Sequence, residues 1–267
     1  MVDITQPGSW DRVAGGYAQS AIANFEPYAG AALRLAGVNA GERVLDVATG
    51  PGTLAIPAAA IADVTAVDFS PEMIAIVRAR AADRELHALT ALVADGQALP
   101  FDDEQFDVAF SMFGLFMFED RAVGFRELAR VLRPGGRAVV GSWPPRDADH
   151  PFTQAGRLLQ PEGASEEPSV GDMPLSDPRE LRREMGAAGF DVRVERFDHT
   201  LRFDSASALA QTLLRSHVGF AALAAEGEEA RYRQVASSLE ALFRRELGEG
   251  AVQVPLSAWL GLGVKES

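Results

Sequence analysis

Residues 42–54 read Glu-Arg-Val-Leu-Asp-Val-Ala-Thr-Gly-Pro-Gly-Thr-Leu. The apolar run at 44–47 has the character of a short buried strand and ends at a glycine-rich turn. An alanine-rich segment of helical character follows at 54–62. A strand, a tight turn and a helix in that order form the first unit of a nucleotide-binding α/β fold.

The same alternation continues to residue 143. The predicted strands are 64–67, 89–93, 106–110 and 137–143, and the predicted helices are 27–36, 71–83 and 121–132. The helix at 71–83 has clear start signals, because Ser70 is placed as its N-cap and Pro71 at its first position. Five near-continuously apolar strands alternating with helices predict a parallel, doubly wound sheet.

Beyond residue 143 the pattern is less regular. The elements predicted there are a loop region at 144–177, a helix at 178–188, an extended strand at 191–203, helices at 205–220 and 228–247, and a closing strand at 256–264. We therefore expect a single domain over 1–267. Its expected parts are an N-terminal helical flap at 1–40, a cofactor-binding core at 41–143, and substrate-cap insertions at 144–176 and 205–250.

Composition narrows the function. The formal net charge is −13 and Lys265 is the single lysine, which argues against nucleic acid or an anionic membrane as the main partner. Cysteine is absent and the four histidines show no close metal-ligand spacing, so no metal is expected. A polar N-terminal stretch and the lack of an apolar run of about 18 residues predict a cytoplasmic protein without a membrane span. We expect a monomer or homodimer that acts on a small molecule.

The glycine turn fits more than one cofactor. Gly50, Gly52 and Ala55 satisfy the loose dinucleotide fingerprint, which allows NAD. Two neighbours argue against a pyrophosphate: the Asp46 carboxylate would repel phosphates, and Pro51 removes a backbone N–H that a phosphate cradle needs. S-adenosylmethionine suits the same turn better, because its amino-acid end carries an ammonium and a sulfonium.

Four ordered motifs between Trp10 and Trp143 resemble class I S-adenosylmethionine-dependent methyltransferases, in the subgroup related to ubiquinone/menaquinone biosynthesis. They are Val-Leu-Asp-Val-Ala-Thr-Gly-Pro-Gly at 44–52, Asp68 after the second strand, Asp-Gly-Gln-Ala-Leu-Pro-Phe at 95–101, and Arg-Val-Leu-Arg-Pro-Gly-Gly at 130–136. The resemblance implies a Rossmann-like, seven-stranded sheet, mostly parallel with an antiparallel last strand, plus helical cap insertions. It also implies S-adenosylmethionine as cofactor and S-adenosylhomocysteine as product, without a metal.

The resemblance also implies a set of cofactor-binding residues. These are Tyr17, Asp46, Ala48, Thr49, Gly50, Gly52, Asp68, Phe69, Met73, Asp95, Gly96, Gln97, Ser111 and Phe113. Gly50 and Gly52 would let the backbone approach the cofactor closely. Asp46 would act near its amino end, or else orient the loop through a hydrogen bond, and Tyr17 would reach its carboxylate.

The ribose and adenine would be held further along the sheet edge. Asp68 can accept hydrogen bonds from both ribose hydroxyls, and Asp95 is placed to accept from the adenine amino group. Phe69 and Met73 would enclose the adenine ring, although packing in the core explains Met73 equally well.

The acceptor pocket is expected where the fourth strand ends. Residues 111–118 include three Phe and two Met, and the predicted pocket residues are Trp10, Met112, Phe116 and Met117. About half of the apolar residues in 111–118 would simply cover the sheet edge. The candidates for a catalytic base are His217, His150 and Asp120, in segments that could face the acceptor.

These observations favour a methyltransferase acting on an O, N or C atom of a small, largely apolar acceptor such as a quinone, polyketide or other natural-product intermediate. Two alternatives keep the same fold and cofactor: a cyclase or eliminase that transfers no methyl group, and a non-catalytic cofactor-binding protein. An NAD-dependent oxidoreductase is a more distant alternative.

Overall fold

The computed structural model describes residues 3–159, 173–225 and 229–266. The strands are β1 (Arg43–Val47), β2 (Asp63–Asp68), β3 (Leu89–Val93), β4 (Phe106–Met112), β5 (Leu132–Ser142), β6 (Phe190–Phe197), β7 (Thr200–Phe203), β8 (Val252–Pro255) and β9 (Ala258–Lys265). The helices are α1 (Pro7–Asp11), α2 (Ala14–Ala36), α3 (Ala55–Ala58), α4 (Pro71–Asp83), the 3₁₀ turn η1 (Leu115–Met117), α5 (Arg121–Val131), α6 (Pro151–Arg157), α7 (Pro178–Ala187), α8 (Ala206–Ser216), α9 (Val218–Ala225) and α10 (Glu229–Leu247).

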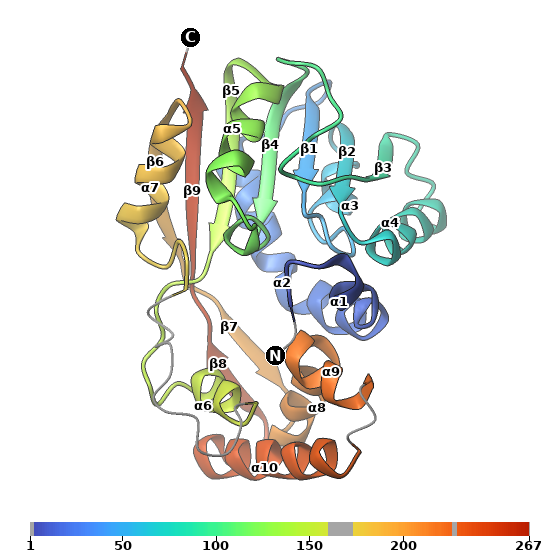
Figure 1. Ribbon diagram of the computed structural model, residues 1–267, viewed down its shortest axis with the longest axis vertical. Coiled ribbons are helices and arrows are strands. Elements are labelled where there is room, and N and C mark those ends of the chain that lie inside the picture. The colour runs from blue at the N-terminus through green and yellow to red at the C-terminus, as the bar shows by residue number, and fades with distance from the viewer. Residues whose placement is uncertain (1–2, 160–172, 226–228, 267) are drawn as a thin grey trace.

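Seven strands form one twisted sheet in the order β3-β2-β1-β4-β5-β9-β6 (Figure 1). β1 to β5 pair in parallel, whereas β9 runs antiparallel to both of its neighbours, β5 and β6. The order reverses between β1 and β4, which is the point where open α/β sheets bind ligands. The predicted fold class, a mostly parallel doubly wound sheet with an antiparallel last strand, is confirmed.

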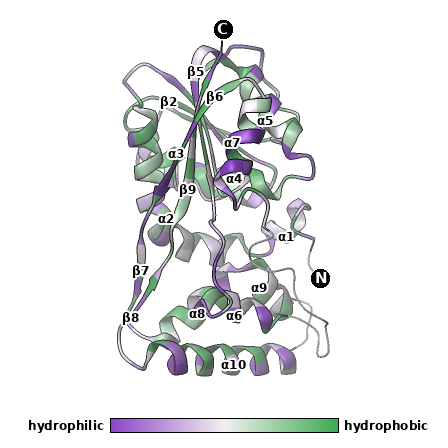
Figure 2. Cartoon of the chain, turned by 90° about the vertical axis from the view of Figure 1, so that its left-hand side faces the viewer, coloured by the Kyte–Doolittle hydropathy of each residue, from purple (hydrophilic) through white to green (hydrophobic). Residues whose placement is uncertain are grey.

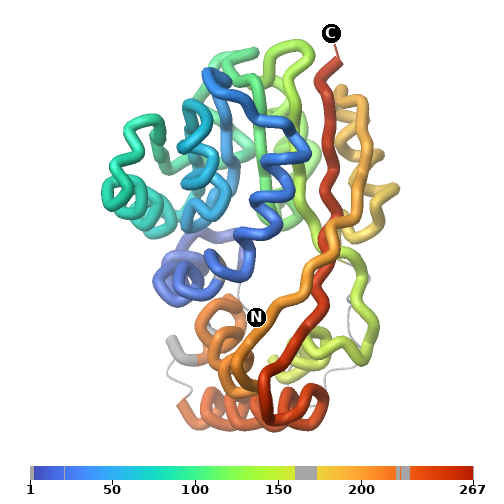
Figure 3. Tube along the Cα trace, turned by 180° about the vertical axis from the view of Figure 1, so that it is seen from behind, coloured from blue at the N-terminus to red at the C-terminus, as the bar shows by residue number. Residues whose placement is uncertain are grey.

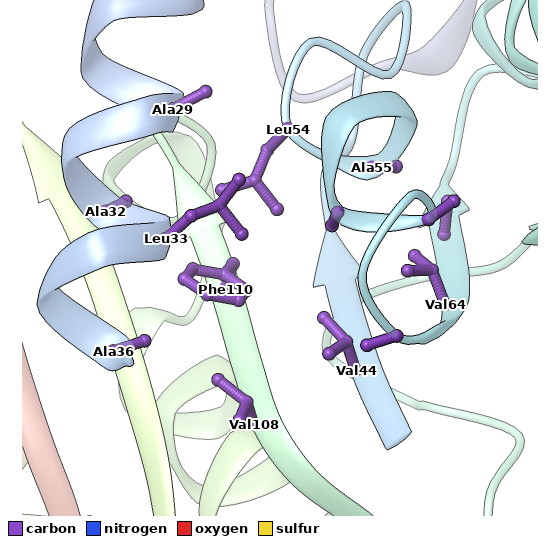
Figure 4. Close-up of a cluster of buried hydrophobic side chains, with 14 of the residues drawn as sticks. Ala29, Ala32, Leu33, Ala36, Val44, Leu54, Ala55, Val64, Val108 and Phe110 are labelled. Carbon is purple, nitrogen blue, oxygen red and sulfur yellow. The ribbon is translucent and has the colours of Figure 1, made fainter. Parts of the chain in front are cut away.

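Helices cover both faces of this sheet. On one face, side chains from α2, α3 and α4 pack on β1, β2 and β4, with Leu33, Leu54 and Phe110 at the centre (Figure 4). On the other face, α5 and α7 bury Phe125, Leu128 and Met185 against the same sheet. Strands buried on both sides account for the continuous apolar runs in the sequence.

A smaller lobe lies beyond the carboxyl ends of the parallel strands (Figure 1). It contains α6, α8, α9, α10 and the two-stranded β7–β8 sheet, and it has a core of its own around Leu209, Phe220, Leu239 and Phe243. Figure 2 shows that α10 mixes hydrophobic and hydrophilic residues along its length, as expected of a helix with one buried face. We call this part the lower lobe.

Two extended segments connect the lobes. Seen from behind, β6 continues into β7, and β8 leads into β9 beside it (Figure 3). Tyr28 of α2 fastens this junction: its hydroxyl donates a hydrogen bond to the carbonyl oxygen of Leu256, and its ring meets those of Phe197 and His199 edge-on at 5.4 Å. Tyr28 is fully buried.

The structure corrects three sequence predictions. The extended strand expected at 191–203 is two strands in different sheets, because pairing with β9 ends at Phe197 and pairing with β8 begins at Thr200. The helix expected to begin at Pro27 is the second half of α2, which begins at Ala14 and contains Pro27. A proline inside a helix removes one hydrogen bond, and here the buried Tyr28, Ala29 and Ala32 hold the helix in place.

The third correction concerns the helix expected at 54–62, which is the single turn α3 followed by a tight turn. Of the insertion expected at 144–176, residues 160–172 lie outside the described residues. No described helix combines the length and the apolar character that a bilayer crossing requires.

Candidate functional site

A cavity of about 350 Å³ opens at the carboxyl ends of β1, β2, β3 and β4. The N-terminal segment and α1 form its outer wall. Its lining residues are Ile4, Thr5, Pro7, Trp10, Tyr17, Ala48, Gly50, Asp68, Phe69, Met73, Ala94, Asp95, Gly96, Gln97, Met112, Phe113, Gly114, Met117, Phe118 and Glu119. Thirteen of these residues were predicted from the sequence to lie at the cofactor or acceptor site.

Asp68 is the last residue of β2 and contributes a buried carboxylate to the cavity wall. It accepts hydrogen bonds from the backbone N–H of Gly50 at 2.8 Å and of Ser70 at 2.9 Å. These contacts fix the glycine turn to the neighbouring strand. Burial raises the pKa of Asp68 to about 6, even though both hydrogen bonds favour the charged form.

A second, smaller cavity of about 50 Å³ lies between the glycine turn and α2. Asp46 lines it, and only 1% of this residue is exposed. The Asp46 carboxylate accepts a hydrogen bond of 2.6 Å from the Thr49 hydroxyl, which orients the loop, and burial raises the pKa of Asp46 to about 7. Tyr17 lines both cavities, and burial raises the pKa of its phenol above the usual value.

The turn after β3 forms another part of the wall. Asp95 accepts a hydrogen bond of 2.8 Å from the backbone N–H of Gln97, whose side-chain oxygen accepts one of 2.8 Å from the N–H of Asp120. Gly96 has no room for a side chain, because an added Cβ would lie 2.8 Å from Val47 and would overlap the ring of Phe118. The turn at 95–97 is thus held in place by the segment at Phe118 to Asp120 and by Val47 of β1.

The N-terminal segment is attached to the core by specific contacts. The Asp11 carboxylate accepts hydrogen bonds from the Ser70 hydroxyl at 2.5 Å and from the N–H of Glu72 at 3.3 Å. Trp10 donates to the carbonyl of Ile4 at 2.9 Å and meets the ring of Tyr17 edge-on at 5.8 Å. These contacts place α1 over the cavity.

The chain that leaves β4 has a strained backbone at the cavity. Phe113 has a φ of 62° and Ala48, across from it, has a φ of 56°, a region that non-glycine residues seldom adopt. The Phe113 ring stacks on Trp143 with centroids 3.8 Å apart and planes 5° from parallel. The backbone at Gly114 approaches Ala48 so closely that an added Cβ would overlap the Cβ of Ala48.

Three residues predicted for the site do not line either cavity. Gly52 has a φ of 76° and faces α4, where an added Cβ would lie 3.2 Å from Val77, so it serves helix packing. Ser111 is fully buried in β4, and Phe116 packs in the core beneath α5. The local geometry explains each case. Gly52 stands in a turn and faces a helix, Ser111 stands in a strand and faces inward, and Phe116 stands in a 3₁₀ turn whose successive residues point to different sides.

The three candidate bases cap helices. Asp120 accepts the N–H of Val123 at 3.0 Å. His150 accepts the N–H of Phe152 at Nδ1, 3.2 Å, and its Nε2 lies 3.1 Å from the carbonyl of Pro255. His217 accepts the N–H of Gly219 at Nδ1, 3.2 Å. Each imidazole lone pair is therefore already engaged, and none of the three residues lines either cavity, so we do not retain them as bases.

Several lining residues were not predicted from the sequence. Ile4, Thr5 and Pro7 are brought in by the fold of the N-terminal segment, for which the sequence offered no periodic signal. Phe118 and Glu119 follow η1 and reach the cavity at the turn before α5. The run of Phe and Met residues at 111–118 was the signal that could have identified Phe118.

The charged residues that line the two cavities are all acidic. The residues lining the larger cavity include three carboxylates, Asp68, Asp95 and Glu119, and Asp46 lines the smaller one. Of the described residues that line either cavity, none is Lys, Arg or His. The site is therefore suited to a cationic or neutral ligand and disfavours phosphate groups.

Comparisons with known proteins agree with this geometry. Residues 44–136 match the protein family described as a methyltransferase domain. The demethylmenaquinone methyltransferase of Thermus thermophilus is 45% identical over 117 residues, which are 43% of this chain and 53% of that protein. The chain spans about half the length of the curated relatives it matches.

Solved structures share the fold across most of the chain. The YcgJ protein of Bacillus subtilis superposes with a TM-score of 0.61 at 20% identity, covering 90% of this chain and 98% of that one. The cyclase SpnF superposes with a TM-score of 0.59 at 22% identity, covering 91% of this chain and 82% of that one. Because these alignments cover about nine tenths of this chain, the shared fold includes most of the lower lobe.

Proposed function

We propose that this chain carries a class I S-adenosylmethionine-dependent methyltransferase domain related to the quinone-biosynthesis enzymes. From this premise, it transfers a methyl group to a small, largely apolar acceptor. The acceptor atom is O, N or C, in a molecule such as a quinone or a polyketide. S-adenosylmethionine would occupy the larger cavity, with its amino-acid end toward Asp46 and Tyr17.

The observation that carries this proposal is that every charged residue lining the two cavities is acidic. A cofactor with an ammonium and a sulfonium group would lower the energy of the buried Asp46 and Asp68 carboxylates, whose pKa values burial has raised. A dinucleotide would instead bring two phosphate charges to the same place. Asp68 would accept from the ribose hydroxyls, which are donors of the type that a buried carboxylate needs.

The residues that follow β4 support the proposal of an apolar acceptor. Met112, Phe113 and Met117 line the cavity together with Trp10 and Phe118, and all five are hydrophobic or aromatic. Methyl transfer is an in-line displacement at a carbon that the sulfonium already activates. The chain's own contribution would be to align the acceptor and exclude water.

The test is calorimetric titration of the protein with S-adenosylmethionine, S-adenosylhomocysteine and NAD in parallel. We expect both sulfur compounds to bind at least about 100-fold more tightly than NAD, a difference of about 2.7 kcal/mol. A screen of hydroquinones and phenols should then give S-adenosylhomocysteine with at least one acceptor. Tighter binding of NAD would contradict the cofactor assignment, and cofactor binding without any S-adenosylhomocysteine formation would contradict methyl transfer.

A further inference from the structure

The strand β6 stands at one end of the seven-stranded sheet (Figure 1). It pairs with β9 along its whole length, from Phe190 to Phe197, without a shift in register. Its other edge has no partner strand among the described residues. An unpaired sheet edge presents a row of backbone N–H and C=O groups that can pair with a further strand. Within the described part of the chain, β6 is therefore an open edge.

Hydrogen bonds at the two ends of β6 show which of its backbone groups face outward. The carbonyl of Gly189 accepts the N–H of Glu266 at 3.0 Å, and the carbonyl of His199 accepts the N–H of Leu256 at 2.8 Å. Bonded positions alternate along an antiparallel strand, so the odd-numbered residues of β6 bond to β9 and the even-numbered residues point away from it. Val194, near the middle, points away, and no described residue hydrogen-bonds its N–H or its carbonyl.

The sequence of β6 carries charges but no other feature that protects a sheet edge. It contains no proline, and its pairing with β9 has no bulge. Asp191, Arg193 and Glu195 are exposed, on the face opposite the one that packs on α7. Nε of Arg193 lies 3.4 Å from Oε1 of Glu195, and both side chains are more than half exposed. Because these charges alternate in sign, the register decides whether they repel or attract a second strand.

A second copy of β6, running antiparallel to the first, meets these charges favourably in one register. When the two-fold axis passes at Val194, the outward N–H and carbonyl of each Val194 bond to those of the other. Arg193 of each copy then lies opposite Glu195 of the other, at positions where facing side chains are closest. A shift by two residues in either direction would instead place Arg193 opposite Arg193, or Glu195 opposite Glu195.

We propose that β6 pairs with β6 of a second copy of this chain, with Val194 at the two-fold axis, and that the chain is a homodimer with one continuous sheet. The open edge, its outward backbone groups and the charge complementarity of a single register support this pairing. Both copies use the same surface, so the assembly closes at two subunits. The inference does not rest on the proposed function, since no residue of β6 lines either cavity.

The test is sedimentation of the full chain in the analytical ultracentrifuge over a range of concentrations. We expect a monomer–dimer equilibrium for the parent chain. Arg193→Glu and Glu195→Arg each place two like-charge pairs in the interface, and each should weaken dimerisation by at least about tenfold. Combining Arg193→Glu with Glu195→Arg restores the opposite charges, so the double variant should dimerise as the parent chain does.

Two further variants separate strand pairing from the effect of charge alone. Arg233→Glu makes the same change in net charge at an exposed position of α10 and should leave dimerisation unchanged. Val194→Pro removes an N–H that points away from β9, so it should prevent dimerisation while β6 keeps its bonds to β9. Circular dichroism checks that each variant is folded. If Val194→Pro is not, the charge variants alone decide the outcome.

The outcomes are distinct from those of the proposed function. A parent chain that stays monomeric, single charge variants that dimerise as the parent does, or a double variant that recovers nothing would each overturn the proposed interface. Assemblies larger than a dimer would contradict its two-fold closure. S-adenosylhomocysteine should bind equally to all of these variants. Its failure to bind to any of them would contradict the proposed function and leave the dimer in place.

Discussion

At the scale of single residues, the Asp68 carboxylate is the group on which cofactor binding is expected to depend most. Replacing Asp68 with Asn keeps one acceptor for the N–H groups of Gly50 and Ser70 but removes the charge offered to the ribose. We expect S-adenosylhomocysteine to bind roughly 10- to 100-fold more weakly, as measured by calorimetry. Asp63→Asn, at the exposed start of the same strand, is the control. Equal affinity in the two variants would remove Asp68 from the site.

Asp46 should make the stability of the ligand-free protein depend on pH. Its pKa is about 7 in the folded state and 3.8 in the reference state, so the folded chain binds the extra proton between these values. The free energy of unfolding therefore falls as the pH rises through this window. Urea unfolding at pH 5 and pH 8 should show a smaller fall in Asp46→Asn than in the parent chain. An identical fall in both proteins would show that Asp46 ionises normally.

Four residues that were predicted for the site from their place at the end of a strand line the larger cavity. Asp68, Phe69, Asp95 and Phe113 follow from the rule that parallel strands direct their carboxyl ends to one edge. Gly52 and Ser111 do not line either cavity, because a motif specifies positions along the chain, whereas the direction of each residue depends on its neighbours in the fold.

At the scale of elements, the cavity depends on two loops that touch. The backbone of Gly114, after β4, lies against Ala48, after β1, and leaves no space for a methyl group. Gly114→Ala should separate these loops, lower the free energy of unfolding by about 1–3 kcal/mol, and weaken binding of S-adenosylhomocysteine. Urea unfolding and calorimetry measure the two effects.

The control for this prediction is Gly15→Ala in α2, where an added Cβ meets nothing within 4 Å. It should keep the affinity and leave stability equal or slightly higher, because alanine favours a helix over glycine. Retained stability and affinity in Gly114→Ala would show that the two loops can separate without cost.

Element boundaries were predictable where capping residues mark them and not where strands change sheets. The helix α4 was predicted with its observed bounds because Ser70 and Pro71 define its start. The break between β6 and β7 escaped prediction, because the residues 191–203 are uniformly extended in character and the change of partner strand after Phe197 depends on the lower lobe. The start of α2 was also mispredicted, because Pro27 was taken as the first residue of a helix that in fact begins at Ala14.

At the scale of the whole molecule, the continuity of β6–β7 and β8–β9 should make the two lobes unfold together. Tyr28 joins α2 to this junction through the buried carbonyl of Leu256. Tyr28→Phe leaves that carbonyl unpaired, and we expect a loss of about 1–3 kcal/mol in one cooperative transition. Scanning calorimetry with equal calorimetric and van't Hoff enthalpies would agree with this.

Tyr232→Phe is the matched control, since that hydroxyl lies on α10 in the lower lobe, away from the junction, and should cost little. Two separate transitions in the parent chain, or a split introduced by Tyr28→Phe, would show that the lobes are independent units.

The position of β9 also has a consequence for how the protein is made. β9 pairs with β5 on one side and β6 on the other, yet it comes after both in the chain. During synthesis the first five strands can assemble in order, whereas the long edge of β5 stays open until the segment from Ala258 onward has emerged. The stretch of β5 that β9 pairs with, Arg137 to Ser142, would until then be an open edge, which is a template for pairing with other nascent chains. Because β9 follows both of its partners in the chain, its pairing closes this edge and so would also protect the growing sheet from misassembly.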